Sequence, residues 1–220
     1  MAVVDFSLEG RTAVVTGGSR GIGRSIAIAL GEAGANVVIG ARKQESLDEA
    51  VAAVEATGAR ALGVVTNVRE MDALTNLVRA TREAFGRLDV LVNNAGTNPV
   101  TGPIANVDER AWDVILNTNL RSVFFLSKLA REAMIEQGGG GSIVNISSTS
   151  GLRAGNNLGA YSVSKAGLLM LTRVLAAEWG ADGIRVNAVA PGLIRTEFSR
   201  AMWERPNGGG EIGRGLRSEE

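Results

Sequence analysis

The sequence contains no cysteine and no histidine. The protein therefore forms no disulfide and offers no thiol nucleophile, no Ser/His catalytic pair and none of the usual zinc-ligand sets. If it catalyses a reaction, the acid or base must be a Tyr, Lys, Asp or Glu side chain. The absence of cysteine and histidine thus limits the candidate catalytic acids and bases to a few residue types.

A surplus of positive charge is also missing, because 23 Lys and Arg residues balance 23 Asp and Glu residues. This balance does not favour nucleic acid or an anionic membrane surface, so small molecules are the expected partners. No apolar run approaches the roughly 18 residues of a membrane helix, and no basic segment followed by a long apolar stretch begins the chain. We expect a cytoplasmic protein with no membrane span and no metal site.

Apolar residues make up 45% of the 220-residue chain, which is enough to bury one core. We therefore expect a single domain over residues 1–203. The remaining segment, 204–220, is rich in glycine and shows no apolar alternation. This tail is expected to be disordered.

Segments typical of strands and helices alternate along the chain. Strands are expected at 12–16, 36–39, 61–65, 88–92, 142–146 and 184–189. Helices are expected from 22, around 47–56, at 71–85, at 108–137 with a bend near 117–119, and through 161 to about 179. This alternation predicts a parallel sheet with helices on both faces, a doubly wound α/β fold of the Rossmann type.

Three glycines mark the first strand-to-helix connection, with the spacing Gly-x-x-x-Gly-x-Gly. Gly17 allows a tight turn, Gly21 lets the backbone approach a pyrophosphate, and Gly23 allows close packing. The helix N-terminus would attract the anion. A glycine loop without a ligand is the alternative, but the flanking strand and helix favour a dinucleotide site.

Tyr161 and Lys165 are four residues apart in the last expected helix, so both side chains lie on one face. A nearby ammonium favours the phenolate and would lower the Tyr161 pKa from about 10 toward neutrality. Tyr161 would then serve as a general acid or base. An exposed tyrosine beside a solvated lysine is the alternative that this spacing by itself leaves open.

Together these motifs resemble the short-chain dehydrogenase/reductase family over roughly residues 8–198. The similarity is greatest to the 3-oxoacyl-carrier-protein reductases and to the NADP-dependent carbonyl reductases, and segment 190–203 favours the second group. The motifs that carry the resemblance occur in order and are the segment 16–23, the segment 93–96, Asn119, Ser148 with Tyr161 and Lys165, and Pro191-Gly192 with Thr196.

The resemblance implies hydride transfer between NADP(H) and a carbonyl or secondary alcohol, with Tyr161 as proton donor or acceptor. Lys165 would lower the tyrosine pKa and hold the nicotinamide ribose, and Ser148 would hydrogen-bond the substrate carbonyl. Asn119 would hold a water that links Lys165 to solvent. Two donors at the carbonyl oxygen also suit the oxyanion that develops during reduction. Ser147 is the alternative to Ser148.

NADP(H) is expected in preference to NAD(H), because the segment after the second strand, 40–42, has no acid for a ribose 2′-hydroxyl. Arg20 and Arg42 suit a 2′-phosphate instead, unless both are merely solvated. Asn67 stands where the family usually has an aspartate facing the adenine amino group, and its carbonyl can accept the same bond. The residues expected to bind the cofactor are Gly17, Ser19, Arg20, Gly21, Ile22, Gly23, Arg42, Asn67, Val68, Asn94, Ala95, Gly96, Tyr161, Lys165, Pro191, Gly192, Ile194 and Thr196.

Other expectations concern residues around this centre. Asn93 would belong to the site motif or would mainly stabilise the central sheet, and Thr196 would bind the nicotinamide carboxamide or cap a helix. The expected substrate pocket, which fits acyl chains, ketones, sugars or steroids equally well, is lined by Thr97, Asn98, Leu152, Arg153, Leu193 and Phe198.

The family pairs subunits through helices that correspond here to 108–137 and 159–180, so at least a homodimer is expected. Ala160, Ser164, Ala166 and Gly167 would permit close approach of two subunits or would pack on the sheet. The family's seventh strand has no counterpart after residue 192, which predicts six strands, an unpaired edge at 184–189 and an altered or truncated C-terminus.

Two other functions remain open. The chain would be a cofactor-binding but catalytically idle regulatory or scaffolding protein, or a related dehydratase or epimerase that uses bound cofactor catalytically. The presence of Ser148, Tyr161 and Lys165 together disfavours the idle protein.

Overall fold

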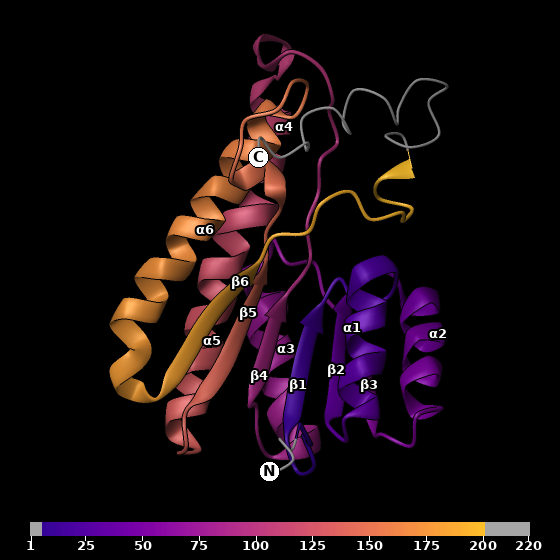
Figure 1. The fold of residues 1–220 in the computed structure, drawn as a ribbon. Helices are drawn as coiled ribbons and strands as arrows, with labels where there is room; N and C mark the ends of the chain where they lie inside the picture. The colour runs from indigo at the N-terminus through magenta and orange to yellow at the C-terminus, as the bar shows by residue number, and fades with distance from the viewer. Residues whose placement is uncertain (1–5, 201–220) are drawn as a thin grey trace, which may run out of the picture.

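The computed structural model describes residues 6–200, in which six parallel strands form one sheet (Figure 1). The strand order is β3-β2-β1-β4-β5-β6, so the direction of winding reverses between β1 and β4. This is the expected doubly wound α/β fold. The strands are β1 (Thr12–Thr16), β2 (Asn36–Ala41), β3 (Ala61–Val65), β4 (Val90–Asn93), β5 (Gly141–Ile146) and β6 (Ile184–Val189).

Helices cover both faces of the sheet. In Figure 1, α1 and α2 lie together beside β1, β2 and β3, whereas α5 and α6 lie at the β5 and β6 end. The helices are α1 (Gly21–Glu32), α2 (Gln44–Glu55), α3 (Met71–Phe85), α4 (Glu109–Leu116), α5 (Ser122–Glu136) and α6 (Gly159–Trp179).

Alternate residues of β1 serve two separate cores. Val14 belongs to the core that α3, α5 and α6 close, whereas Ala13 and Val15 belong to the core that α1 and α2 close. All of β1 is therefore buried, as a central parallel strand must be when both of its faces are covered. Packing in the two cores fixes the positions of β1 and β4 in the sheet. The carboxyl ends of these strands carry the glycine loop and the segment 94–96.

The expected bounds of β1, β3, α3 and β6 agree with the structure. β4 begins at Val90 rather than at 88, because the Gln137 side chain occupies the backbone of Leu88 through two hydrogen bonds of 2.8 Å. The long helical region consists of α4, a π-helical turn at Asn117–Arg121 and α5. Asp108 caps α4, because its carboxylate accepts a 2.7 Å hydrogen bond from the Ala111 amide.

Within residues 6–200 the sheet ends at β6, which pairs with β5 alone. Its alternate residues Arg185, Asn187 and Val189 are exposed. The expected boundary at residue 203 and the tail at 204–220 lie outside the described residues. Across the described part of the chain, no helix combines the length and the hydropathy needed to cross a membrane.

Candidate active site

The carboxyl ends of β1, β4 and β5 bring the sequence motifs to one edge of the sheet (Figure 1). The glycine loop follows β1, the segment 94–96 follows β4, and Ser147 and Ser148 follow β5. The strand order reverses between β1 and β4, and in folds of this type ligands bind at such a reversal, in the crevice outside the carboxyl ends of the strands. The segment that leaves β6 crosses the same edge toward α1 in Figure 1.

The glycine loop leaves no room for side chains. Gly17 and Gly21 have φ angles of 63° and 55°, which L side chains rarely adopt. A Cβ on Gly23 would overlap the Asn94 amide nitrogen and the Gly17 carbonyl oxygen. Gly17 and Gly21 thus form a turn that other residues would strain, and Gly23 lets the loop pack closely on Asn94 at the start of α1, where a helix N-terminus favours an anion.

Asn94 ties the glycine loop to the segment after β4. Its side-chain amide donates to the carbonyl oxygens of Thr16 and Gly17 at 2.9 and 3.1 Å. The Thr16 hydroxyl oxygen accepts from the amides of Asn94 and Ala95, each at 3.1 Å. The sequence analysis did not assign a role to Thr16, although a hydroxyl at the end of a strand before a glycine loop is the signal that marks it.

Lys165 is 4% exposed, and its Nζ atom donates a 2.7 Å hydrogen bond to the carbonyl oxygen of Ile146 at the end of β5. Burial disfavours the ammonium and lowers the Lys165 pKa to about 8. The Ser147 hydroxyl donates at 3.0 Å to the carbonyl oxygen of Lys165 itself. Two hydrogen bonds between β5 and α6 therefore fix the position of this lysine.

Tyr161 lies one turn before Lys165 on α6. Burial raises its pKa above 10, and this effect exceeds the lowering caused by a hydrogen bond with the Ser148 side chain. The expected lowering by Lys165 was wrong for this structure, because the ammonium is bonded to Ile146 and its Nζ atom lies 5.7 Å from the centre of the tyrosine ring. Tyr161 is therefore a protonated phenol.

The structure gives the two neighbouring serines different surroundings. Ser147 is 4% exposed, and its hydroxyl is committed to the Lys165 backbone. Ser148 precedes a 3-10 turn (Thr149–Gly151), accepts from the Ser150 amide at 3.1 Å, and hydrogen-bonds Tyr161. The effect of Ser148 on the Tyr161 pKa thus favours Ser148 as the partner of Tyr161, and the hydrogen bond to Lys165 makes Ser147 an anchor for α6.

Asn119 lies within the π-helical turn and is fully buried. Its side-chain amide donates to the Thr97 carbonyl oxygen at 2.9 Å and to the Ser164 hydroxyl at 3.0 Å, and its carbonyl oxygen accepts from the Thr97 amide at 2.8 Å. Both donor hydrogens are thereby used by protein atoms. The side chain clamps Thr97, and its carbonyl oxygen keeps a second lone pair, so the expected water link to Lys165 stays a prediction.

Gly96 lies between these groups. A Cβ on this glycine would be 3.5 Å from the Asn119 carbonyl oxygen and 3.6 Å from the Lys165 Nζ atom. Asn93, three residues earlier, is buried and bonds Ser127 and Asn145 rather than facing the crevice. The sheet-stabilising interpretation of Asn93 is therefore the one that its contacts support.

The outer part of the expected cofactor site is exposed. Arg20 and Arg42 both face solvent, and neither makes an ion pair with another described residue. Asn67 donates to Glu70 at 2.5 Å and accepts from the Arg69 amide at 3.3 Å, which occupies part of the carbonyl that was expected to meet adenine.

The segment after β6 reaches the other expected positions. A Cβ on Gly21 would lie 3.4 Å from a Thr196 methyl carbon, so Thr196 borders the glycine loop. The Thr196 amide donates to the Ser199 hydroxyl at 3.0 Å. The Pro191 carbonyl oxygen accepts from the Thr149 amide at 3.0 Å, which places Pro191 beside the turn that carries Ser148.

Exposed apolar side chains accompany Tyr161. The Phe198 ring lies 6.3 Å from the Tyr161 ring, and Phe198 is 51% exposed. Leu152, Leu193 and Ile194 are also exposed. Of the expected substrate-pocket residues, Phe198 lies near the Tyr161 ring, and Thr97 is held beside Gly96 through Asn119.

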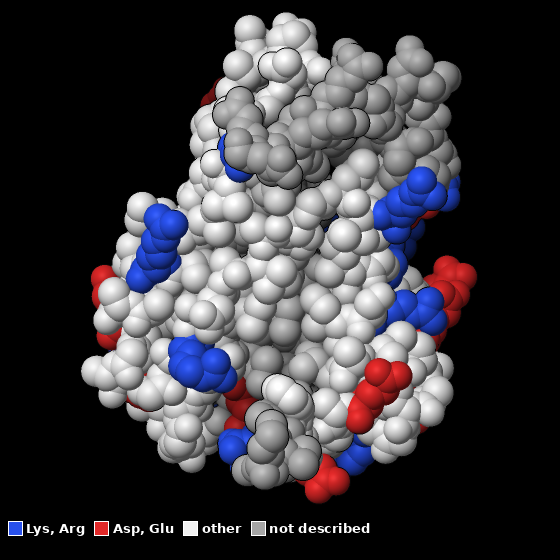
Figure 2. Space-filling model, viewed as in Figure 1, with Lys and Arg blue, Asp and Glu red and all other residues white. Residues whose placement is uncertain are grey.

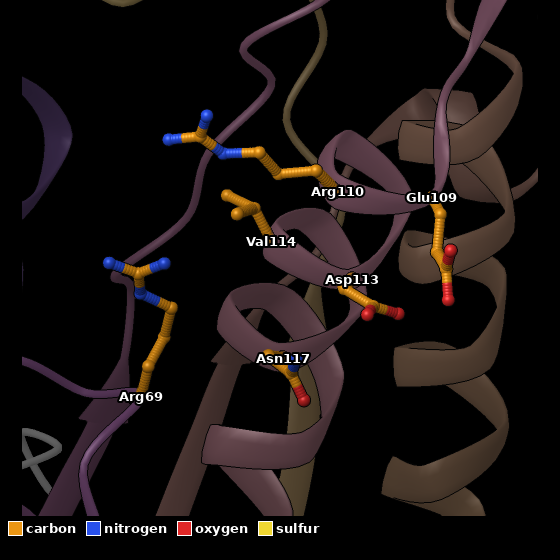
Figure 3. Close-up of a pocket in the computed structure, with 6 residues that line it drawn as sticks. All are labelled: Arg69, Glu109, Arg110, Asp113, Val114 and Asn117. Atoms are coloured by element: carbon orange, nitrogen blue, oxygen red, sulfur yellow. The ribbon is translucent and has the colours of Figure 1, made fainter.

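A hollow with charged walls lies between the loop after β3 and α4 (Figure 3). In Figure 3 the guanidinium groups of Arg69 and Arg110 extend to the same side, with Val114 between them, whereas the carboxylates of Glu109 and Asp113 point away. Figure 2 shows lysine and arginine side chains at the margins of the face that it displays and few charges in its centre. The sequence analysis did not predict this hollow.

Known proteins resemble this chain over most of its length. The family model for short chain dehydrogenases matches residues 11–207. The short chain dehydrogenase/reductase astE of Aspergillus oryzae is 46% identical over 200 residues, which are 90% of this chain and 77% of the relative.

Two solved structures extend the comparison to the fold. A candidate short-chain alcohol dehydrogenase from Sinorhizobium meliloti is 46% identical, with a TM-score of 0.88 over 93% of this chain and 80% of the other. A candidate NAD(P)-dependent gluconate 5-dehydrogenase from Beutenbergia cavernae is 37% identical, with a TM-score of 0.88 over 96% and 83% of the two chains. Motifs, fold and relatives agree, and the chain belongs to the short-chain dehydrogenase/reductase family of NAD(P)-binding oxidoreductases.

Proposed function

We propose that this protein is an NADP(H)-dependent oxidoreductase that interconverts carbonyls and secondary alcohols, with Tyr161 as the general acid or base. The observation that carries the proposal is the group formed by Tyr161, Ser148 and Lys165. A half-buried phenol hydrogen-bonds Ser148, and a buried amine lies one turn further along α6. No His or Cys exists to take the role of Tyr161.

The residues divide the work at the carbonyl oxygen. In reduction, the Tyr161 and Ser148 hydroxyls hydrogen-bond this oxygen, and the Tyr161 proton moves to it as the C–H bond forms at the carbonyl carbon. In oxidation, the proton returns to the tyrosine oxygen. The bound nicotinamide supplies or accepts the hydride.

Lys165 would stabilise the phenolate that Tyr161 leaves after giving up its proton. With a pKa of about 8, the lysine is largely an ammonium at neutral pH. One of its three ammonium hydrogens is donated to the Ile146 carbonyl oxygen at 2.7 Å, so the others would serve a cofactor ribose or the tyrosine oxygen. Ser147 keeps the lysine backbone in place.

The residues present fit a dinucleotide. The glycine loop, which packs closely on Asn94 at Gly23, would hold the pyrophosphate at the start of α1. Arg20 and Arg42 would bind a ribose 2′-phosphate, which favours NADP(H) over NAD(H). Among solved relatives, the Beutenbergia cavernae protein contains NADP, whereas a xylitol dehydrogenase that is 32% identical contains NAD⁺. The preference in this chain therefore rests on its own arginines.

The test is consumption of NADPH with a panel of ketones, aldehydes, sugars and 3-oxoacyl thioesters. Tyr161→Phe should abolish turnover, because it keeps the ring and removes the proton, while NADPH binding by fluorescence persists. Ser150→Ala, which alters the same loop, is the matched control and should retain activity. Near-normal turnover by Tyr161→Phe would overturn the mechanism. NADPH binding without turnover of any carbonyl by the unaltered protein would instead support the idle or the dehydratase and epimerase alternatives.

We also propose a homodimer. Exposed apolar side chains mark the two helices that the family uses for pairing, with Phe124 and Ile135 on α5 and Val163, Met170 and Val174 on α6. The small residues are less informative. Ala160 and Ser164 are buried within the subunit, and a Cβ on Gly167 would meet the Leu120 side chain at 3.0 Å. The cytoplasmic location expected from the sequence stays a prediction.

A further inference from the structure

Four buried polar side chains form a connected chain beneath the active site. The Asn93 amide on β4 donates to the Ser127 hydroxyl on α5 at 3.0 Å and to the Asn145 carbonyl oxygen on β5 at 2.9 Å. The Asn145 amide donates to the Thr172 hydroxyl on α6 at 2.9 Å, and Thr172 donates in turn to the Leu168 carbonyl oxygen at 2.8 Å.

None of these side chains is more than 6% exposed. A polar group left unpaired in such surroundings would lose its hydration without compensation. Each of these side chains therefore needs its particular hydrogen-bond partner. The network links two strands to the two helices that pack beside them. Hydrophobic packing alone tolerates small sliding of a helix, whereas a buried amide bonded to a hydroxyl does not.

Further hydrogen bonds between the end of β5 and α6 continue from the Asn145–Thr172 bond toward the active site. Along β5, Asn145 bonds Thr172, the Ile146 carbonyl accepts from Lys165, and Ser147 donates to the Lys165 carbonyl. Ser148, the next residue, hydrogen-bonds Tyr161. Thr172 and Lys165 are seven residues apart, two turns along the same buried face of α6.

The proposed reaction would disturb the hydrogen bond between Lys165 and Ile146. Lys165 would share its ammonium hydrogens between Ile146 and a cofactor or the tyrosine oxygen, so its bond to Ile146 would weaken at that moment. The Asn145–Thr172 bond involves no reacting group and stays in place. Both side chains are at most 6% exposed, so the bond is shielded from solvent.

We propose that Asn145 and Thr172 are positioning residues, which set the register of α6 on β5 and thereby hold Tyr161 opposite Ser148 during the reaction. The inference rests on the proposed function for its catalytic consequence, but its geometric part concerns the Tyr161–Ser148 contact alone. Asn93 and Ser127 share the network without touching α6, so they support the sheet and α5 rather than the catalytic helix.

This division provides a matched pair of variants. Thr172→Val removes the hydroxyl that Asn145 bonds on α6, and Ser127→Ala removes the hydroxyl that Asn93 bonds on α5. Each leaves one buried amide hydrogen without its partner, so both should lower the melting temperature by a few degrees. Thr172→Ser keeps the hydroxyl and should behave like the unaltered protein.

Two readouts separate positioning from general destabilisation. Because Tyr161 is the single tyrosine of the chain, phenolate absorbance titrates it alone. Thr172→Val should raise the Tyr161 pKa further, since the hydrogen bond with Ser148 that lowers it is weakened. In turnover it should lower kcat about tenfold with the KM for NADPH unchanged. Ser127→Ala should change neither the tyrosine titration nor kcat.

Equal effects of Thr172→Val and Ser127→Ala on the titration and on kcat would show a purely structural network and overturn the proposal, as would an unchanged titration in Thr172→Val. If the unaltered protein turned over no carbonyl, the proposed function would fail. The titration would still decide whether Thr172 sets the Tyr161–Ser148 contact.

Discussion

The Nζ atom of Lys165 is hydrogen-bonded at 2.7 Å to the backbone carbonyl of Ile146, and not to the tyrosine one turn before it. This relationship places the amine inside the protein, where burial lowers its pKa to about 8. It also leaves Tyr161 without a close positive charge, so burial raises the tyrosine pKa. Burial thus sets the pKa values of both side chains before any ligand arrives.

The pH dependence of stability should reveal Lys165. Its pKa of about 8 in the folded protein lies below the ordinary value of 10.5, so the folded state binds fewer protons between these values and its stability rises with pH across this window. Lys165→Met removes the buried charge. The free energy of unfolding of the variant minus that of the unaltered protein should be about 2 kcal/mol lower at pH 9.5 than at pH 7. Urea unfolding at both pH values measures this, and an equal difference at the two would contradict it.

Tyr161 should titrate above pH 10 in the folded protein, because burial outweighs the Ser148 hydrogen bond. Phenolate absorbance measures this directly, since the chain contains a single tyrosine. Ser148→Ala should raise the value further by removing the bond that favours the phenolate. The same protein in concentrated urea, where the value should return to about 10, is the control. A folded-state value below 10 would restore the original expectation of a lowered pKa.

Arg42 and Arg20 should determine the choice between NADPH and NADH. Arg42→Ala should lower kcat/KM for NADPH about tenfold, the loss of one charge-assisted hydrogen bond to phosphate, and should leave the value for NADH unchanged. Arg20→Ala should act in the same direction. Arg185→Ala is the control, because this exposed arginine lies at the start of β6, away from the crevice. Equal losses with both cofactors would show that the arginines do not contact a 2′-phosphate.

Asp89, which lies directly before β4 at the amino ends of the strands, should stabilise the fold. Burial raises its pKa, but hydrogen bonds from Arg87, the Thr12 amide and Arg11 outweigh this and leave the pKa below 3.8. Its contribution is therefore present above pH 3.8 and is lost as the pH falls through the lowered value. Asp89→Asn should cost about 2 kcal/mol at pH 7 and less at pH 3, measured by urea unfolding.

The exposed pair Arg79 and Glu83 provides the control for Asp89. Glu83→Gln should change stability by less than about 0.5 kcal/mol at either pH, because solvent screens this ion pair. If both substitutions had the same small effect, the buried carboxylate of Asp89 would not be a stabilising centre.

Light scattering at micromolar concentration tests the dimer. Val163, Met170 and Val174 are exposed at spacings of seven and four residues, so they form one stripe on α6. Met170→Glu should convert dimer to monomer, because it would bury a carboxylate without a partner in the interface. Val65→Glu, at an exposed valine on β3, should not change the mass. A monomer in the unaltered protein would remove the proposal.

The sequence determined the order of strands and helices, because apolar periodicity is a local signal that parallel strands and amphipathic helices express directly. β1, β3 and α3 have their expected bounds, and β4 differs because Gln137, almost fifty residues further on, occupies the backbone of Leu88. The glycine spacing and the Tyr161–Lys165 spacing were also readable from the sequence, since each is a property of one short segment.

Tertiary structure decided which groups meet and how strongly burial acts on them. The choice between Ser147 and Ser148, the Lys165 bond to Ile146 and the raised pKa of Tyr161 all depend on how α6 packs against the end of β5. No local pattern reports the desolvation of a side chain or the direction of a hydrogen bond between distant segments. The same reason hid the link between Asn145 and Thr172, because two ordinary polar residues acquire a role only when folding buries them together.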